Sequence, residues 1–224
     1  RVRELKLKMF SVLLFFLSAT QFSHSSPSYY SDQHALLTFK LSISPDPLNS
    51  LQDWSSNHST CYWTGVSCSS RRLRVVSLNL TGMALVGTIS PFIGNLSFRR
   101  VLDLSYNSFN GKIPYQLGGL FRLRRLRLAK NDFEGSIPPN LRGCRSLQLL
   151  SLSYNHLSGT IPSQLSLLSH LEIIYLGVNQ LTGTIPSSLG NLSSLSNLQL
   201  NQNRLHGSIP VELGMLTQLE VVLS

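Results

Sequence analysis

The sequence predicts an α/β repeat fold, a solenoid of 24-residue repeats with a parallel β-sheet on its concave face. Three recurrences carry this prediction. An asparagine returns every 24 residues, at Asn107, Asn131, Asn155, Asn179 and Asn203. A glycine follows each asparagine, and an isoleucine–proline pair follows the glycine, as at Gly135, Ile137 and Pro138. A constant period of this size is typical of stacked units that cannot bury their apolar faces alone.

A short strand is expected before each asparagine, because apolar residues alternate there with a period of two. Leu102 and Leu104 of one copy correspond to Leu126 and Leu128 of the next. The alternation directs these leucines into the solenoid and leaves the residues between them on an exposed sheet. The recurring asparagine would satisfy backbone groups where the chain leaves the strand, because its amide both donates and accepts hydrogen bonds.

Residues 1–26 are predicted to be a secretory signal peptide. Basic residues occupy the start, an apolar run follows at residues 9–17, and small and polar residues continue to Ser26. This order is typical of a secretory leader, and the apolar run is too short to span a bilayer. The chain is therefore expected to enter the secretory pathway.

Residues 27–73 lack the repeat and are predicted to form an N-terminal cap over the open end of the solenoid core. Asp32 is expected to cap a helix over residues 34–43, with Leu36, Phe39 and Ile43 on one face at helical spacing. The helix would stop at the aspartate–proline pair of residues 46–47.

The three cysteines have different expected roles. Cys61 and Cys68 stand seven residues apart in a secreted chain, which predicts a disulfide; a metal site would need further ligands. Cys144 occupies a repeat position that holds leucine in other copies, so we expect a small buried apolar residue there.

Residues 74–224 are predicted to hold six complete repeats and the truncated start of a seventh. The chain ends at Ser224 inside the seventh predicted strand. An uncapped solenoid would expose its apolar core and a strand edge, so we expect the chain to be a fragment or a truncated product.

The cap and repeats resemble the extracellular part of plant leucine-rich-repeat receptor-like kinases. The cap sequence SDQHALLTFKLSISPDPLNSLQDW, the segment CYWTGVSC and the copies of N-x-F/L-x-G-x-I-P carry the resemblance. It is strongest to the branch with the receptors for bacterial flagellin and elongation factor Tu and the rice resistance receptors. The resemblance implies a cell-surface defence receptor that binds a peptide or protein ligand, with a co-receptor kinase as a further candidate partner. The membrane span and the kinase domain would lie beyond this sequence.

A second functional class stays open. Secreted polygalacturonase-inhibiting proteins share the G-x-I-P repeat, so the alternative is a self-contained secreted binder, such as a cell-wall enzyme inhibitor or a decoy. A self-contained binder would end with a capped last repeat, and this difference favours the receptor.

The exposed strand face is predicted to bind the ligand. We call its polar and aromatic residues the concave strip: Asp103, Tyr106, Arg125, Arg127, Lys130, Tyr154, Tyr175 and Gln199. Paired guanidinium groups suit a carboxylate, and tyrosines on a rigid sheet are good contact anchors. A solvated cationic face explains the same charges, because further arginines crowd these repeats at other phases: Arg99, Arg100, Arg122, Arg124, Arg142 and Arg145.

Four N-x-S/T motifs predict glycosylation in a secreted chain, at Asn57, Asn95, Asn191 and Asn79. Asn79 ranks last, because it falls on the strand face, where a glycan would obstruct binding.

Catalysis is not expected from this segment, and neither is a cofactor or a metal. The sequence contains no phosphate-binding glycine loop or HExxH helix, and its histidines occupy unrelated repeat positions. Asp103 stands without a second carboxylate on the strand face, whereas acid–base chemistry usually needs a partner group. Nucleic acid is not expected as a partner of a secreted chain, despite the formal charge of +9.

Overall fold

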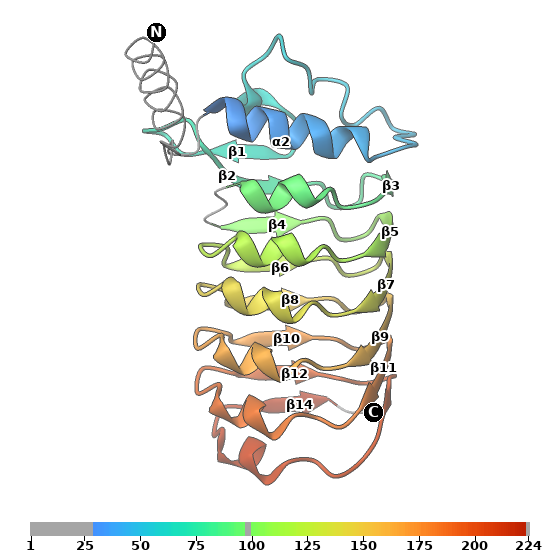
Figure 1. Ribbon diagram of the computed structural model, residues 1–224, viewed down its shortest axis with the longest axis vertical. Coiled ribbons are helices and arrows are strands. Elements are labelled where there is room, and N and C mark those ends of the chain that lie inside the picture. The colour runs from blue at the N-terminus through green and yellow to red at the C-terminus, as the bar shows by residue number, and fades with distance from the viewer. Residues whose placement is uncertain (1–28, 97–99, 223–224) are drawn as a thin grey trace, which may run out of the picture.

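The computed structural model describes residues 29–96 and 100–222, which form one elongated stack with the cap at one end (Figure 1). The predicted signal peptide at residues 1–26 lies outside the described residues. In the part of the chain that is described, no helix is long and apolar enough to cross a membrane.

The predicted parallel sheet is confirmed on the concave face. Its strands follow the chain in order, with the antiparallel β1 beside β2 at the cap end. They are β1 (Val66–Cys68), β2 (Val75–Asn79), β4 (Val101–Asp103), β6 (Arg125–Arg127), β8 (Leu149–Ser151), β10 (Ile173–Tyr175), β12 (Asn197–Gln199) and β14 (Glu220–Val222). Leu102 pairs with Leu126 and Leu126 with Leu150, so equivalent residues of successive copies stand side by side.

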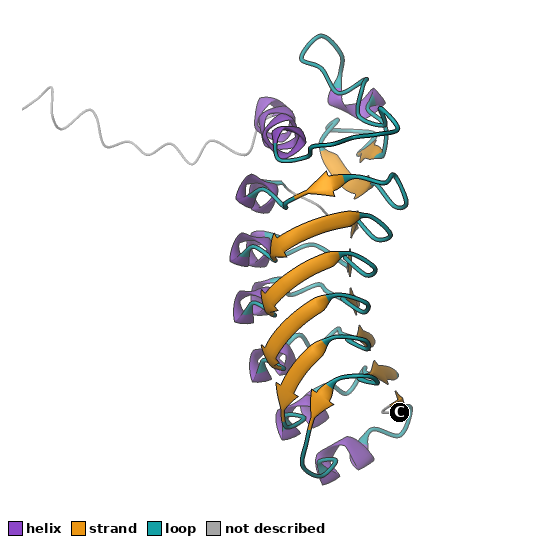
Figure 2. Cartoon of the chain, turned by 90° about the vertical axis from the view of Figure 1, so that its right-hand side faces the viewer, coloured by secondary structure: helices purple, strands orange, loops and turns teal. Residues whose placement is uncertain are grey.

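A second parallel sheet, which the sequence analysis did not predict, runs along the side of the stack (Figure 2). Its strands follow the repeat position that holds asparagine in five copies and Met83 in the first: β3 (Val86–Gly87), β5 (Ser108–Lys112), β7 (Asp132–Ser136), β9 (His156–Thr160), β11 (Gln180–Gly183) and β13 (Arg204–Leu205). These strands are rich in polar residues, and pairing between copies satisfies their backbone groups. All of these strands except β13 contain a glycine with positive φ, such as Gly159, whose φ of 75° suits a residue without a Cβ.

Short 3-10 helices return the chain along the convex face (Figure 1). After η1 (Thr60–Tyr62) in the cap, they are η2 (Pro91–Asn95), η3 (Tyr115–Gly119), η4 (Pro139–Gly143), η5 (Ser163–Leu167), η6 (Ser187–Asn191) and η7 (Val211–Met215). Most of them start directly after the proline of the repeat or at a proline. Each buries one apolar side chain, Leu141 in η4 for example, under the concave sheet.

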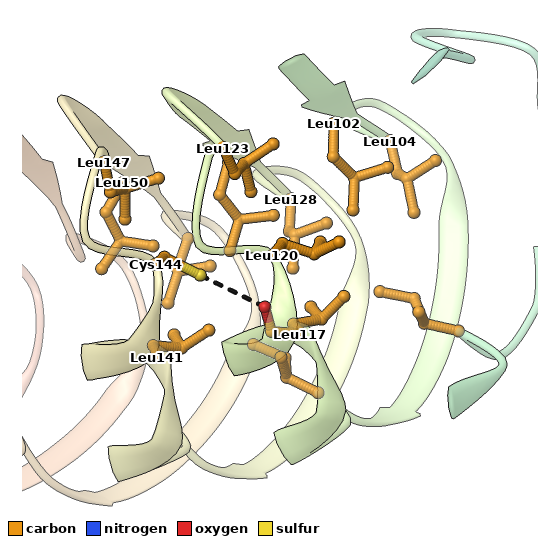
Figure 3. Packing of buried hydrophobic residues seen from close by; sticks show 14 of the residues in the cluster. Leu102, Leu104, Leu117, Leu120, Leu123, Leu128, Leu141, Cys144, Leu147 and Leu150 are labelled. Atoms are coloured by element: carbon orange, nitrogen blue, oxygen red, sulfur yellow. Dashed lines mark hydrogen bonds between the residues drawn. The ribbon is translucent and has the colours of Figure 1, made fainter. Parts of the chain in front are cut away.

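Leucines from both faces fill the interior and meet in columns (Figure 3). Cys144 is fully buried in such a column, as expected, and its Sγ lies 3.2 Å from the carbonyl oxygen of Leu117. Burial raises the pKa of the Cys144 thiol to about 12, so this residue is a neutral core group.

The recurring asparagines link successive copies. Asn155 donates from Nδ2 to the carbonyl oxygens of Leu128 in the preceding copy and Leu152 in its own, both at 3.0 Å. Its Oδ1 accepts from the N–H of Phe133, also at 3.0 Å. Bonds of the same kind occur at Asn107, Asn131, Asn179 and Asn203.

The cap is helical and its predicted disulfide is present, with 2.04 Å between the sulfur atoms of Cys61 and Cys68. The prediction that Asp32 caps the helix is wrong. Helix α2 spans Tyr29–Leu41, so Asp32 lies in its first turn, and its carboxylate faces inward. Leu36 and Phe39 are buried as expected, whereas Ile43 is buried beyond the end of the helix.

The expected stop at residues 46–47 is also wrong, because α2 already ends at Leu41. Tight turns end it, with the N–H groups of Ser42 and Ile43 donating to the carbonyl oxygens of Phe39 and Lys40. Asp46 has a different role. Its carboxylate accepts hydrogen bonds from the N–H groups of Ser50 and Leu51, which orders the following turn.

Candidate functional site on the concave face

The strands of the concave sheet and the bends that follow them position the side chains of the concave strip. The strands of the concave sheet point every second side chain outward, and the chain then bends before each asparagine. At the bend the residues of successive copies adopt positive φ, 58° at Tyr106, 54° at Lys130 and 58° at Tyr154. Their N–H groups bond to the next copy, so the bend repeats with the same geometry and stacks these side chains.

Lys130 lies between two tyrosine rings. Its Nζ is 4.5 Å from the ring centre of Tyr106 and 5.2 Å from that of Tyr154, within the range of cation–π attraction. Both tyrosines remain more than half exposed, at 57% and 52%. The three side chains therefore form an ordered column of aromatic surface with a positive charge at its centre.

Asp103 and Arg127 form an ion pair at 3.4 Å, Arg127 Nη1 donating to Asp103 Oδ2. The second carboxylate oxygen of Asp103 accepts from the N–H of Ser105 at 3.0 Å. The expectation that Asp103 is exposed is wrong: only 6% of the residue is accessible, because Arg127 and the backbone cover it. Arg127 is half-buried and already has a carboxylate partner, so the two guanidinium groups of the strip are not equivalent.

Arg125 is exposed at the start of β6, beside Val101 and Leu149 of the neighbouring strands. Within residues 29–96 and 100–222, its guanidinium group makes no ion pair. Arg125 is thus the member of the arginine pair whose charge is available to a ligand.

The two remaining members of the strip lie further from the cap along the stack. Tyr175 ends β10 and Gln199 ends β12, and the two are partners in the parallel register. Both are half-buried, so they extend the strip with less accessible surface than the tyrosines of the column.

The predicted glycosylation positions are all accessible. Asn57, Asn79, Asn95 and Asn191 are exposed, although Ser97 of the third motif lies outside the described residues. Asn79 ends β2 on the concave face, and its Oδ1 accepts from the N–H and hydroxyl of Thr81. In the described part of the chain, no group of three His, Cys, Asp or Glu residues could hold a metal ion.

Two family models match the chain. The model described as a leucine-rich repeat region matches residues 74–223, two-thirds of the chain. The chain belongs to the leucine-rich-repeat family. A second model, described as a leucine-rich-repeat N-terminal domain, matches residues 30–69. The resemblance to plant leucine-rich-repeat receptor kinases is confirmed by the relatives that follow.

Among curated proteins, the leucine-rich-repeat chain is similar to the LRR receptor-like serine/threonine-protein kinase EFR of Arabidopsis thaliana. The two are 45% identical over 110 residues, which cover 49% of this chain and 11% of EFR. The matched segment thus spans about a tenth of the length of that relative.

Solved structures of plant receptor ectodomains share the fold. The PEPR1–AtPEP1 structure has a TM-score of 0.81 at 34% identity, covering 86% of this chain and 28% of that chain. The Arabidopsis receptor kinase HAESA, in complex with the peptide hormone IDA and the co-receptor SERK1, has a TM-score of 0.78 at 38% identity. That match covers 86% of this chain and 33% of the HAESA chain.

Proposed function

We propose that this leucine-rich-repeat segment recognises a peptide or protein ligand on its concave strip, as the extracellular part of a plant receptor-like kinase. The single observation that carries the proposal is the Tyr106–Lys130–Tyr154 column. Large aromatic side chains are exposed there, yet held in a fixed arrangement by the repeated bend. Ordered aromatic anchors lose little side-chain entropy on binding, which favours affinity.

The charges of the strip suggest which ligand it suits. Arg125 presents a planar guanidinium group that can hold a carboxylate in two hydrogen bonds. Lys130 carries a second positive charge, partly shielded by the tyrosine rings. The proposed ligand therefore has an acidic group for Arg125 and apolar or aromatic side chains for the column. Arg127 would mainly stabilise the strip through its ion pair with Asp103.

The receptor context rests on the relatives. HAESA is described in complex with a peptide hormone and a co-receptor, which supports a peptide or protein partner for this chain. A location at the outer face of the plasma membrane, a co-receptor kinase partner and a role in defence are parts of the same proposal. The kinase activity of the relatives would belong to residues beyond this segment.

Selection of peptides on the full chain tests the proposal. A phage-displayed library of random peptides is panned against the protein, and the affinity of selected peptides is measured by calorimetry. Replacing both tyrosines (Tyr106→Ala with Tyr154→Ala), or Arg125→Ala alone, should weaken binding by about tenfold or more, since buried contact anchors exceed 1 kcal/mol.

Matched controls separate the strip from general surface effects. Tyr115→Ala removes an exposed tyrosine from η3 on the convex face, and Arg204→Ala removes an exposed arginine from β13 on the side of the stack. Both should leave affinity unchanged. Selected peptides that bind every strip variant as tightly as the unaltered protein would refute the proposal.

A further inference from the structure

A second cluster of positive charge lies away from the concave strip, along the edge where the concave strands begin. The edge patch consists of Arg100, Arg122, Arg124, Arg145 and Phe121. Arg100 directly precedes β4, and the other members lie in the segments that lead from η3 into β6 and from η4 into β8, at the left-hand edge of Figure 1. All five side chains are exposed.

The backbone fixes the spacing of these arginines. The N–H of Arg124 bonds to the carbonyl oxygen of Arg100 at 3.1 Å, and the N–H of Gln148 bonds to that of Arg124 at 2.8 Å. Arg100, Arg124 and Gln148 therefore occupy the same position of adjacent copies, about 4.8 Å apart. Arg122 lies beside this row, with its guanidinium carbon 4.9 Å from the ring centre of Phe121.

The patch has no internal counter-charge. Within the described ranges, 29–96 and 100–222, none of its four arginines forms an ion pair. The three segments concerned contain no described Asp or Glu. Like charges on adjacent copies repel each other, and a concentrated cationic surface attracts anions more strongly than an isolated arginine does.

The charge reverses further along the same row. Glu172 follows Gln148, with its N–H bonded to the Gln148 carbonyl oxygen at 2.8 Å and its Oε1 accepting from Gln148 Nε2 at 3.1 Å. Glu220 occupies the equivalent position two copies later. A long uniform polyanion lying along this edge would meet these carboxylates, whereas a short acidic segment would end before them.

We infer that the edge patch is a docking surface for a short acidic segment of a partner protein, distinct from the ligand site on the concave strip. Carboxylates of the segment pair with Arg100, Arg124 and Arg145. The exposed ring of Phe121, 54% accessible, receives an apolar side chain among the acidic ones. The guanidinium of Arg122, stacked on that ring, is held in place for a carboxylate next to the apolar residue.

Fluorescence anisotropy with the full chain tests this inference. The probe is a fluorescein-labelled peptide with a central leucine flanked by glutamates. The double variant Arg122→Gln with Arg124→Gln should bind the probe about tenfold more weakly, because it removes two exposed charge contacts, one of them the guanidinium stacked on Phe121. Binding by the unaltered protein should weaken as salt is raised to about 0.15 M, since exposed charges are screened.

The control variant has the same loss of charge elsewhere. Arg71→Gln with Arg72→Gln removes two exposed arginines from the cap and should leave the affinity for the probe unchanged. Arg204→Gln removes an exposed arginine of β13 on the side of the stack and should also have no effect. Only the labelled probe is used here, so the outcome of peptide selection on the concave strip does not decide this experiment. Thermal unfolding of each variant verifies that the surface changes leave the fold intact.

Three results would overturn the inference. Equal losses in the edge and cap variants would mean that the probe senses net charge only. An unchanged affinity of the edge variant would mean that these arginines make no contact with the probe. Displacement of the probe by polygalacturonate at a lower carboxylate concentration than by unlabelled peptide would identify a long polyanion as the preferred occupant.

Discussion

Arg74 holds the carboxylate of Asp32, which lies 42 residues earlier in the chain, through two hydrogen bonds of 2.6 and 2.7 Å. The N–H of Val75 donates a third bond to the same carboxylate at 3.1 Å. Asp32 is buried, and Arg74 keeps 18% of its side chain accessible. This pair joins α2 to the start of β2, and so joins the cap to the first repeat.

We predict that Arg74→Met destabilises the chain by about 3 kcal/mol, because it leaves a buried carboxylate without its charged partner. The double variant Asp32→Leu with Arg74→Met should lose less than the sum of the single changes, since neither charge is then left unpaired. Urea unfolding measures these differences, with exposed Arg72→Met as a control expected to change stability by less than about 0.5 kcal/mol. Strict additivity of the single changes would contradict the coupling.

The stability of the chain should depend on the recurring asparagines both donating and accepting hydrogen bonds. Asn155→Ala leaves the N–H of Phe133 without its partner and removes one of two asparagine donors from each carbonyl oxygen of Leu128 and Leu152, which keep Asn131 and Asn179. We therefore expect a loss of about 1–3 kcal/mol. Asn155→Asp should cost at least as much, because a second oxygen then faces those carbonyls. Exposed Asn110→Ala should be nearly neutral in the same unfolding experiment. An aspartate variant as stable as the unaltered chain would show that the donor bonds are dispensable.

The Cys144 thiol should make stability depend on alkaline pH. Its pKa is raised to about 12 by burial, whereas the unfolded thiol titrates near the ordinary value of 9.0. The folded thiol keeps its proton where the unfolded thiol loses it. Its contribution is therefore complete below about pH 9 and is lost as the pH rises toward 12.

Comparison with Cys144→Ala isolates this effect. The stability difference between the unaltered chain and the variant should be about 1 kcal/mol smaller at about pH 10 than at about pH 8. In the folded chain at about pH 8 the thiol should also resist a thiol reagent that modifies it rapidly in urea. A pH-independent difference, or rapid modification of the folded protein, would contradict a buried neutral thiol.

Removal of the disulfide should weaken the cap. Cys61→Ser with Cys68→Ser opens a loop closed over a separation of seven residues, which corresponds to about 2 kcal/mol of stability in the chain-entropy model. Proteolysis under native conditions should then cut residues 55–73 before the repeats. Uniform cleavage along the whole chain would indicate instead that the cap and the repeats unfold as one unit.

The period of the sequence predicted the concave sheet, its buried leucines and the place of Cys144, because these features depend only on which residues share a repeat position. The side sheet was missed for a physical reason. Its strands, such as Ser108–Lys112, are mostly polar and are held by backbone pairing between copies, which a single strand's sequence does not display.

Contacts within the candidate site were partly predictable. Asp103 and Arg127 are 24 residues apart, so their ion pair on neighbouring strands follows from the period, although it was not predicted. The placement of Lys130 between two tyrosine rings depends on side-chain conformations that no pattern specifies. The Asp32–Arg74 pair joins a non-repeating cap to a repeat, so periodicity could not have indicated it.

Hydrogen–deuterium exchange of the full chain, with and without a selected peptide, tests the central claim most directly. Binding on the concave strip should slow amide exchange in residues 103–106, 127–130 and 151–154, where the strands and the repeated bend carry the tyrosines and Lys130. Exchange in the side sheet, at residues 108–112, 132–136 and 156–160, should not change. Protection confined to the side sheet or the convex helices would place the ligand elsewhere and contradict the proposed function.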